Sequence, residues 1–485
     1  MIKDLTKGNS LKLIVLFTIP LLIGNLFQQF YSIADAIIVG RTIGMEALAA
    51  VGCTGSLMFL IVGYVFGFTA GMAIVTAQRF GAGDMVGVRK SFAANLILGL
   101  GMTILLTLFG AFFMRPLLVL MRTPPEILDD AHRFIAVIMY GIGTMVLFNV
   151  LSNNLRAVGN SRAPLVFLVI ACLVNIALVY LFICGFGMGV EGAALATIVA
   201  QLCSGLLCLP YILGKSSVFR LSRSDFSLTR DELFAPLRIG FPMGFQTSII
   251  AIGAIIVQFA LNDFGMVAVA AFTAAHRIDL IMTMPLLSFG VTMATYTAQN
   301  FGAKEYRRIR RGVLQCVAIS VTYSLFIGVA SILFGRYFAS FFIASNEQAL
   351  DLARQFLMIS GSCYSVLGLL FIFRNTLQGL GQSVMPTIAG LLELLMRAMA
   401  AFVLASRLGF LGVCVAGPLA WVGACIPLSI TFIISVRRLI KKTQAQPVEL
   451  PTATPLAAPT KARSPHFSVS ETASPANSHD ISCTV

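Results

Sequence analysis

The first long apolar run of the sequence contains a single carboxylate, Asp35, which is the clearest candidate for chemistry. Asp35 follows Tyr31 by four residues and Gln28 by seven, so a helix would place the three side chains on one stripe. A carboxylate inside a bilayer is costly enough to indicate a function. Burial favours its protonated form, which suits a proton carrier, whereas converging oxygens would make it a sodium ligand. Alternatively, the helix ends near Ala34 and Asp35 meets only headgroups and water.

Four more charged residues lie in apolar runs of the second half of the chain. Arg277 and Asp279 are two residues apart and cannot face each other on a helix, whereas Glu393 and Arg397 have the spacing of an intrahelical ion pair. Crossed pairing, Arg277 with Glu393 and Asp279 with Arg397, would make the group neutral. Two interpretations stay open, a structural ion-pair cluster and a second coupling site.

Neutral polar side chains accompany Asp35 in the first half. Asn149 and Asn153 are four residues apart, Asn175 lies in the middle of a later run, and Thr197 lies one turn into the next. Hydrogen bonds between helices explain each of them at least as well as ligand binding does.

The elements that carry these residues are apolar helices. The chain has 485 residues, of which 58% are hydrophobic and 11% are charged, while a soluble protein has roughly a quarter charged. So few charges cannot cover soluble domains of this size, which leaves an all-α polytopic membrane protein. Twelve runs reach the length of about 20 residues that spans a bilayer. They are residues 13–39, 48–77, 92–120, 134–155, 164–186, 193–213, 239–261, 267–298, 313–342, 356–380, 387–408 and 413–436.

The distribution of basic residues predicts the orientation. Most of the 34 Lys and Arg residues fall in alternate loops on one side, so we expect both termini in the cytoplasm of a multi-pass cell-membrane protein. The net charge of +14 then reflects topology and not nucleic-acid binding. Residues 443–485, rich in Pro, Thr, Ala and Ser, are predicted to be a disordered cytoplasmic tail. Residues 214–238 form a polar linker between six helices in 1–213 and six in 239–442.

The two halves repeat one another. The segment Thr76-Ala-Gln-Arg-Phe-Gly-Ala82 returns 221 residues later as Thr297-Ala-Gln-Asn-Phe-Gly-Ala303. At nearly the same shift, matches link Gly44–Ala50 with Gly265–Ala271, Pro20 with Pro242, and Gly159-Asn-Ser161 with Gly381-Gln-Ser383. An even number of helices gives both copies the same orientation. The sequence therefore predicts two parallel six-helix repeats around a central cavity.

These motifs resemble the multidrug and toxic compound extrusion (MATE) transporters of bacteria. The resemblance covers about residues 5–440 and rests on the repeats above together with Gln28-Gln-Phe-Tyr-Ser-Ile-Ala-Asp35, Leu155–Ser161, Leu377–Ser383 and Gly187–Ala194. It implies an antiporter that exports organic compounds, cationic and amphipathic, in exchange for sodium ions or protons by alternating access. It also implies a cation site formed by Asp35, Asn149, Asn153, Asn175 and Thr197, with Tyr31 beside it.

One position departs from that family pattern. Many bacterial members have an Asp four residues after the Asn of the fifth helix, where this chain has Val179. With one carboxylate in place of two, proton coupling through Asp35 is favoured over a sodium site. We expect no cofactor and no tightly bound metal.

Other classes of protein fit less well. The chain has neither HExxH nor GxSxG, so we do not expect an enzyme. A flippase for a lipid-linked precursor is the alternative among transporters; it would need basic residues facing the cavity. We expect a monomer that binds a small-molecule substrate, contacted by Gln28, Asp35 and the charges at 277, 279, 393 and 397, and membrane lipid, but no nucleic acid. Pro20 removes a backbone donor from the first helix and predicts a hinge there.

Overall fold

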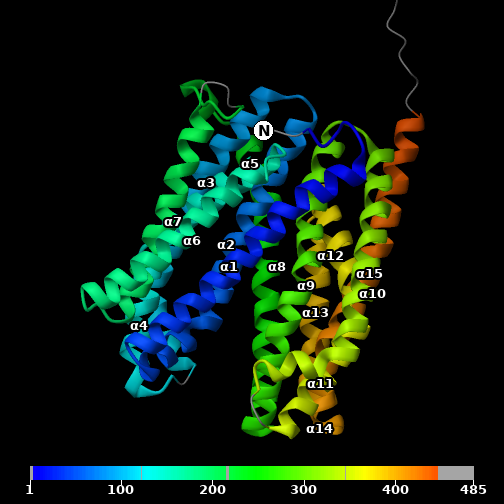
Figure 1. Cartoon of the computed structure of the whole chain (residues 1–485). Helices are drawn as coiled ribbons and strands as arrows, with labels where there is room; N and C mark the ends of the chain where they lie inside the picture. The colour runs from blue at the N-terminus through cyan, green and yellow to red at the C-terminus, as the bar shows by residue number, and fades with distance from the viewer. Residues whose placement is uncertain (1–3, 122, 215–217, 344–345, 446–485) are drawn as a thin grey trace, which may run out of the picture. The chain divides into compact units, whose positions relative to one another are not determined.

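In the computed structural model, residues 4–445 are described except 122, 215–217 and 344–345, and within them the regular structure is helical (Figure 1). The described residues up to Lys441 form one compact unit. Its helices are α1 (Ser10–Thr42), α2 (Met45–Gly81), α3 (Met85–Leu120), α4 (Pro125–Tyr140), α5 (Ile142–Ala157), α6 (Arg162–Tyr180), η1 (Leu181–Gly185), α7 (Val190–Leu213), η2 (Arg223–Phe226), α8 (Arg230–Asn262), α9 (Gly265–Gly302), α10 (Tyr306–Ser340), α11 (Glu347–Ser362), α12 (Tyr364–Gly379), α13 (Val384–Met399), η3 (Ala400–Leu404), α14 (Ala405–Leu408) and α15 (Phe410–Ala445). Beyond Ala445 the expected tail lies outside the described residues.

The spans agree with the predicted twelve once two bent pairs are counted. Ten helical segments are long and apolar enough to cross a membrane. The other two spans are α4 with α5, bent by 46°, and α11 with α12, bent by 51°. The bends fall at Gly141 and Cys363, which are 222 residues apart, and π-helical turns follow α6 and α13 in the two halves. The irregularities of the fold are therefore repeated along with its helices.

Close packing between α2 and α8 joins the two halves. Glycine recurs at every fourth position of α2, at 63, 67 and 71, and α8 presents Gly240 and Gly244 to it. A Cβ atom at Gly67 would lie 2.4 Å from the carbonyl oxygen of Met243, and one at Gly71 would lie 2.6 Å from the Cα of Gly240. Small residues at this spacing let membrane helices approach until their backbones touch.

The repeated Thr-Ala-Gln motif forms a reciprocal contact between the halves. Gln78 of α2 donates from Nε2 to the carbonyl of Gly379 (2.9 Å), and its counterpart Gln299 of α9 donates to the carbonyl of Ala157 (2.7 Å). The two carbonyls are themselves related by the repeat, at the ends of α12 and α5. We call these two hydrogen bonds the glutamine lock.

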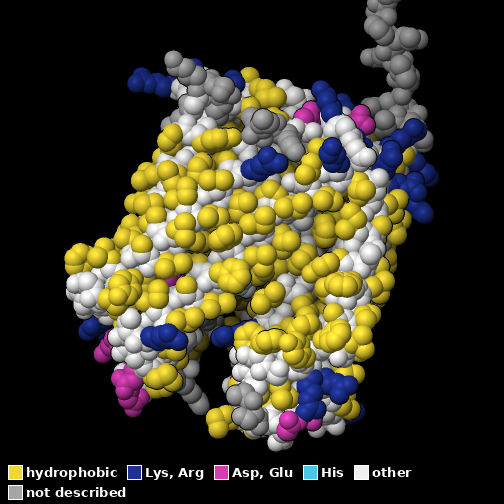
Figure 2. All heavy atoms as spheres, viewed as in Figure 1, with side chains coloured by type: hydrophobic (Ala, Val, Ile, Leu, Met, Phe, Trp, Pro, Cys, Tyr) yellow, Lys and Arg dark blue, Asp and Glu magenta, His cyan; other side chains and the backbone are white. Residues whose placement is uncertain are grey.

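Glycine permits the glutamine lock to close. A Cβ atom at Gly81 would lie 1.9 Å from the carbonyl oxygen of Gln299, and one at Gly302 would lie 1.8 Å from that of Gln78. The lock lies beside the segment that precedes α1, since Gln299 also accepts a hydrogen bond from the backbone N–H of Leu5 at 3.0 Å. We call the face of the unit where α1 begins the terminal face (Figure 1). The opposite end is hollowed between the part that carries α4 and the part that carries α11 and α14, as Figure 2 shows.

The linker between the halves is shorter than expected. α8 begins at Arg230, nine residues before the predicted Ile239, because Thr229 and Glu232 form a capping box that starts the helix early. Before it, the short helix η2 holds Asp225 in a second capping box.

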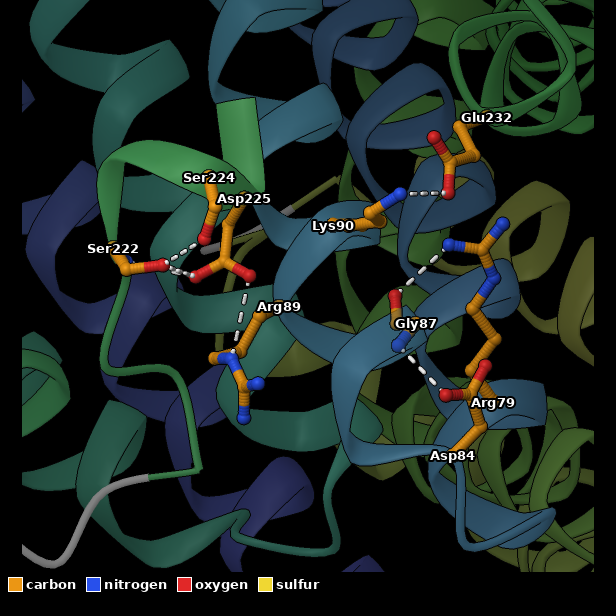
Figure 3. A network of polar contacts seen from close by, with 9 residues as sticks. All are labelled: Arg79, Asp84, Gly87, Arg89, Lys90, Ser222, Ser224, Asp225 and Glu232. Carbon is orange, nitrogen blue, oxygen red and sulfur yellow. Dashed lines mark hydrogen bonds and ion pairs between the residues drawn. The ribbon is translucent and has the colours of Figure 1, made fainter. Parts of the chain in front are cut away.

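Ion pairs attach the linker and the start of α8 to the start of α3 (Figure 3). Arg89 lies 3.4 Å from Asp225, and Lys90 lies 3.0 Å from Glu232. Burial alone would raise the pKa of Asp225, but hydrogen bonds from Ser222 and Arg89 outweigh burial and lower it. Figure 3 also shows the neighbouring turn, in which Arg79 and Asp84 bond the backbone of Gly87.

The glycine contact gives a stability prediction. Gly67→Ala should destabilise the protein by about 1 to 3 kcal/mol, because the added methyl overlaps the α8 backbone. The loss is measured as a lower unfolding temperature in detergent. Gly101→Ala is the matched control, since its Cβ would meet nothing within 4 Å, and we expect it to be neutral or stabilising. Equal unfolding temperatures for the two variants would contradict the packing argument.

Candidate functional site

The structure brings together Asp35 and three of the residues predicted around it. The Tyr31 hydroxyl of α1 lies 3.0 Å from the Thr197 hydroxyl of α7, and Asn175 Nδ2 of α6 lies 3.5 Å from the same hydroxyl. The carboxyl group of Asp35 interacts with the Tyr31 hydroxyl one turn earlier. Asn175 is fully buried. A carboxylate, two hydroxyls and an amide from three helices therefore form one cluster.

Several oxygens near this cluster are buried without a hydrogen-bond donor. Among the described residues, Asp35 Oδ1, Asn175 Oδ1 and Gln201 Oε1 have no partner. A buried acceptor without a donor costs free energy, so such oxygens are suited to receive a proton or a cation. Gln201 was not predicted; the available signal was its position one turn after Thr197 on α7.

Three of the predicted residues do not join the cluster by hydrogen bonds. Asn149 donates to the carbonyl of Met145 in its own helix, and Asn153 donates to Thr69 of α2 at 3.0 Å. The side chain of Gln28 makes no hydrogen bond within the described part of the chain. The contact of Asn153 matches the alternative interpretation, in which the asparagines join helices, whereas that of Asn149 stays within α5.

Val179 occupies the position at which many bacterial members of the resembled family have a second acid. Its side chain is fully buried in an apolar cluster with Val39 and Ile183. No group of three or more His, Cys, Asp and Glu side chains able to hold a metal occurs among the described residues. The cluster thus offers one carboxylate and several neutral oxygens.

A buried network missed by sequence analysis lies nearby. Asn154 Oδ1 of α5 accepts from the Thr76 hydroxyl (2.9 Å) of α2 and from Asn95 Nδ2 (3.1 Å) of α3. Thr76 begins the repeated motif, which was the signal available. The network joins three helices just before the glutamine lock.

The crossed pairing predicted in the second half is wrong. Glu393 of α13 pairs with Arg374 of α12 and lies 3.9 Å from Arg397 on its own helix. Asp279 of α9 accepts a hydrogen bond from the Tyr364 hydroxyl at 2.8 Å, and Arg277 is exposed on the surface of the unit. Arg277 and Asp279 are two residues apart, so they lie on different sides of α9. Asp279 therefore faces the interior, whereas Arg277 does not reach Glu393.

Arg374 completes a buried group that the sequence did not reveal. It lies within the predicted span 356–380 but was not singled out there, and it is buried within α12. Arg397 donates to the carbonyl of Ile250 of α8 at 3.0 Å. A second hydrogen bond to α8 runs from the side chain of Gln378 to that of Gln246 at 2.7 Å. Two guanidinium groups face one carboxylate, so the group carries a net positive charge when ionised.

Two parallel sets of apolar helices with a polar cluster inside the first define a polytopic membrane transporter of small molecules. Comparison with known families agrees, because the MatE family model matches residues 20–181 and, 222 residues later, 242–403. The chain therefore belongs to the MatE family, the MATE multidrug efflux transporters, whose members are transporters and not enzymes.

Individual relatives and solved structures are similar over most of the chain. A probable multidrug resistance protein of Bacillus subtilis, YpnP, is 28% identical over 80% of this chain and 87% of its own. An FAD transporter of Shewanella oneidensis is 24% identical over 74% of this chain and 80% of its own. A solved outward-facing conformation of a multidrug resistance MATE transporter of the MOP superfamily has a TM-score of 0.83 and 25% identity, covering 90% of this chain and 98% of that one.

The corrected pairing gives a second prediction. Glu393→Gln leaves the buried Arg374 without its counter-charge, and we expect a loss of about 3 to 5 kcal/mol in unfolding free energy. Glu347→Gln is the matched control, because Glu347 pairs with Arg336 at the surface, where we expect a loss of about 0 to 1 kcal/mol.

A double variant tests which arginine is the partner. Removing Glu393 and Arg374 together should restore most of the unfolding temperature. If removing Glu393 with Arg397 restored more, Arg397 and not Arg374 would be the main partner.

Proposed function

We propose that this protein is a secondary active antiporter that exports organic, amphipathic and cationic compounds in exchange for protons. The observation that carries this proposal is the state of Asp35, an acid in an apolar helix with one buried oxygen that lacks a donor. Nearby, the position of a second acid is filled by the buried Val179. A single carboxylate can take up and release one proton without other charged ligands, whereas sodium prefers several oxygens.

Alternating access would use the two ends of the unit. The glutamine lock closes the terminal face, and the opposite end is hollowed (Figure 2). We infer from the basic loops that the terminal face and both termini lie in the cytoplasm. This arrangement would then be an outward-facing state.

Protonation of Asp35 would bias the exchange between states. A proton removes the charge from the half-buried Asp35 and so changes the free energy of burying that end of α1. α1 passes through Pro20 as one helix, and the hinge at this residue stays part of the proposal. We place Gln28 and Arg277, which have no side-chain partner among the described residues, at the substrate cavity, and we propose that the protein acts as a monomer.

A second candidate function is export of an anionic or lipid-linked compound. Arg374 and Arg397 together outnumber Glu393 inside the second half, and the FAD transporter among the relatives is named for an anionic substrate. Transport of a cationic dye, of FAD and of a lipid-linked precursor should be compared in vesicles that contain the purified protein. Uptake of the dye alone would support the first candidate.

The coupling role of Asp35 is tested by Asp35→Asn. The amide keeps the shape but cannot titrate, so gradient-driven efflux should be abolished while the unfolding temperature stays unchanged. Efflux is measured in vesicles with an imposed gradient. Asp263→Asn, at the exposed end of α8, makes the same charge change and should transport normally. Normal efflux by Asp35→Asn would remove Asp35 from the mechanism.

The coupling ion is tested separately. A pH gradient should drive efflux by the unaltered protein, and a sodium gradient at constant pH should not. Efflux that follows sodium at constant pH would refute proton coupling while leaving the antiport mechanism in place.

The glutamine lock gives a prediction for the closed face. Replacing Gln78 and Gln299 by Met removes the two hydrogen bonds of the lock and the one that Gln299 accepts from Leu5. At about 1 kcal/mol each, their loss should open the terminal face about 100-fold more often. The change is measured as faster amide hydrogen exchange in residues 76–82 and 297–303. Gln258→Met, on an exposed side chain bonded to Asn262, is the control. Unchanged exchange in the double variant would show that the lock does not hold this face closed.

A further inference from the structure

A cavity of about 470 Å³ lies outside the transport site, between the segment that precedes α1 and the start of α10. It is lined by Thr6, Gly8, Asn9, Ser10, Glu305, Arg307, Arg308 and Arg311. None of these residues takes part in the Asp35 cluster or in the charged group around Glu393.

The wall formed by the N-terminal segment is fixed in place. Arg308 donates from Nη1 to the carbonyl of Gly8 (2.7 Å) and from Nη2 to that of Leu5 (3.3 Å). The Tyr296 hydroxyl donates to Ser10 at 2.9 Å, and the Leu5 side chain is 1% exposed. The cavity is therefore built from the buried contacts of a docked segment and not from a loose loop.

The charge of the lining is positive. Arg307 and Arg311 lie one turn apart on α10, both are exposed, and neither has an ion-pair partner in the described ranges. Glu305 is the acidic residue of the lining. Arg308 is engaged with backbone carbonyls but keeps its charge, so three guanidinium groups stand against one carboxylate.

We infer that this cavity binds a phosphate group, carried by an anionic lipid headgroup or by a free phosphate compound. Guanidinium groups recognise phosphate oxygens through pairs of parallel N–H donors, and Arg307 with Arg311 offers two such forks at helical spacing. The hydroxyls of Thr6 and Ser10 supply smaller polar contacts in the same lining. In the proposed orientation the cavity faces the cytoplasmic leaflet, where anionic headgroups attract basic segments.

Occupation of the cavity would act on the closed face. Leu5 donates its backbone N–H to Gln299 Oε1 at 3.0 Å, and Gln299 is half of the glutamine lock. A phosphate that joins α10 to the N-terminal segment thus stabilises the segment that braces the lock. The site itself does not depend on the transported substrate or on the coupling ion.

The test measures the unfolding temperature of the full chain in detergent as phosphatidylglycerol, phosphatidylcholine or inorganic phosphate is added. Phosphatidylglycerol should stabilise the protein saturably and phosphatidylcholine should not. In R307Q/R311Q the half-saturating amount should rise about 10- to 30-fold, since each basic residue near an anionic surface contributes about a factor of five. R230Q/R310Q removes the same charge from exposed arginines outside the lining. This control should change the half-saturating amount of phosphatidylglycerol less than about threefold.

The outcomes separate the sources of the phosphate. Stabilisation by phosphatidylglycerol alone assigns the site to a lipid, and stabilisation by inorganic phosphate that R307Q/R311Q abolishes assigns it to a free phosphate compound. Both results support the site. The inference is overturned if neither probe binds saturably, or if R230Q/R310Q weakens binding as much as R307Q/R311Q does.

Discussion

The approach of α2 to α8 and α9, which glycine permits, determines how the two halves of the chain meet. A side chain at Gly67 or Gly71 would enter the backbone of α8, and one at Gly81 would enter that of α9. Apolar surface gains little by leaving lipid for another apolar surface, so membrane helices associate through close packing and hydrogen bonds. Here the close packing and the hydrogen bonds occur along one interface, since Gln78 follows the glycines of α2 on the same helix. The same interface must loosen if the terminal face is to open.

The two halves share a backbone plan but differ in their polar interiors. In the first half, Asp35 has no counter-charge, and buried oxygens of Asn175 and Gln201 lack donors. In the second half, Glu393 is paired with arginine and Asp279 receives a hydrogen bond from Tyr364. Buried polar atoms without a partner occur in both halves, and Arg374 Nε is one of them. The difference lies in two carboxylates: among the described residues Asp35 has no basic partner, whereas Glu393 has two. This difference is the physical reason for proposing Asp35 and not Glu393 as the coupling group.

Sequence predicted what depends on length and on local spacing. Apolar runs marked the spans, the repeat marked the duplication, and helical spacing placed Tyr31 beside Asp35. Partners on other helices were harder, because they depend on how each helix is rotated about its axis. The spacing of Glu393 and Arg397 identified the intrahelical neighbour but not Arg374, which is the closer one. Apolar content also concealed the bends at Gly141 and Cys363, since a bent pair is as apolar as a straight span.

The docking of the N-terminal segment has a consequence for biogenesis. Leu5 bonds to Gln299, 294 residues away, and Gly8 bonds to Arg308, 300 residues away. At synthesis rates of about 5 to 20 residues per second, the segment waits roughly 15 to 60 s for its partners to leave the ribosome. During that interval the first six helices are inserted with their leading segment undocked. The segment before α1 is therefore among the last of these elements to reach its final place, although it is made before them, and a chain arrested before α9 could not bury Leu5 in this way.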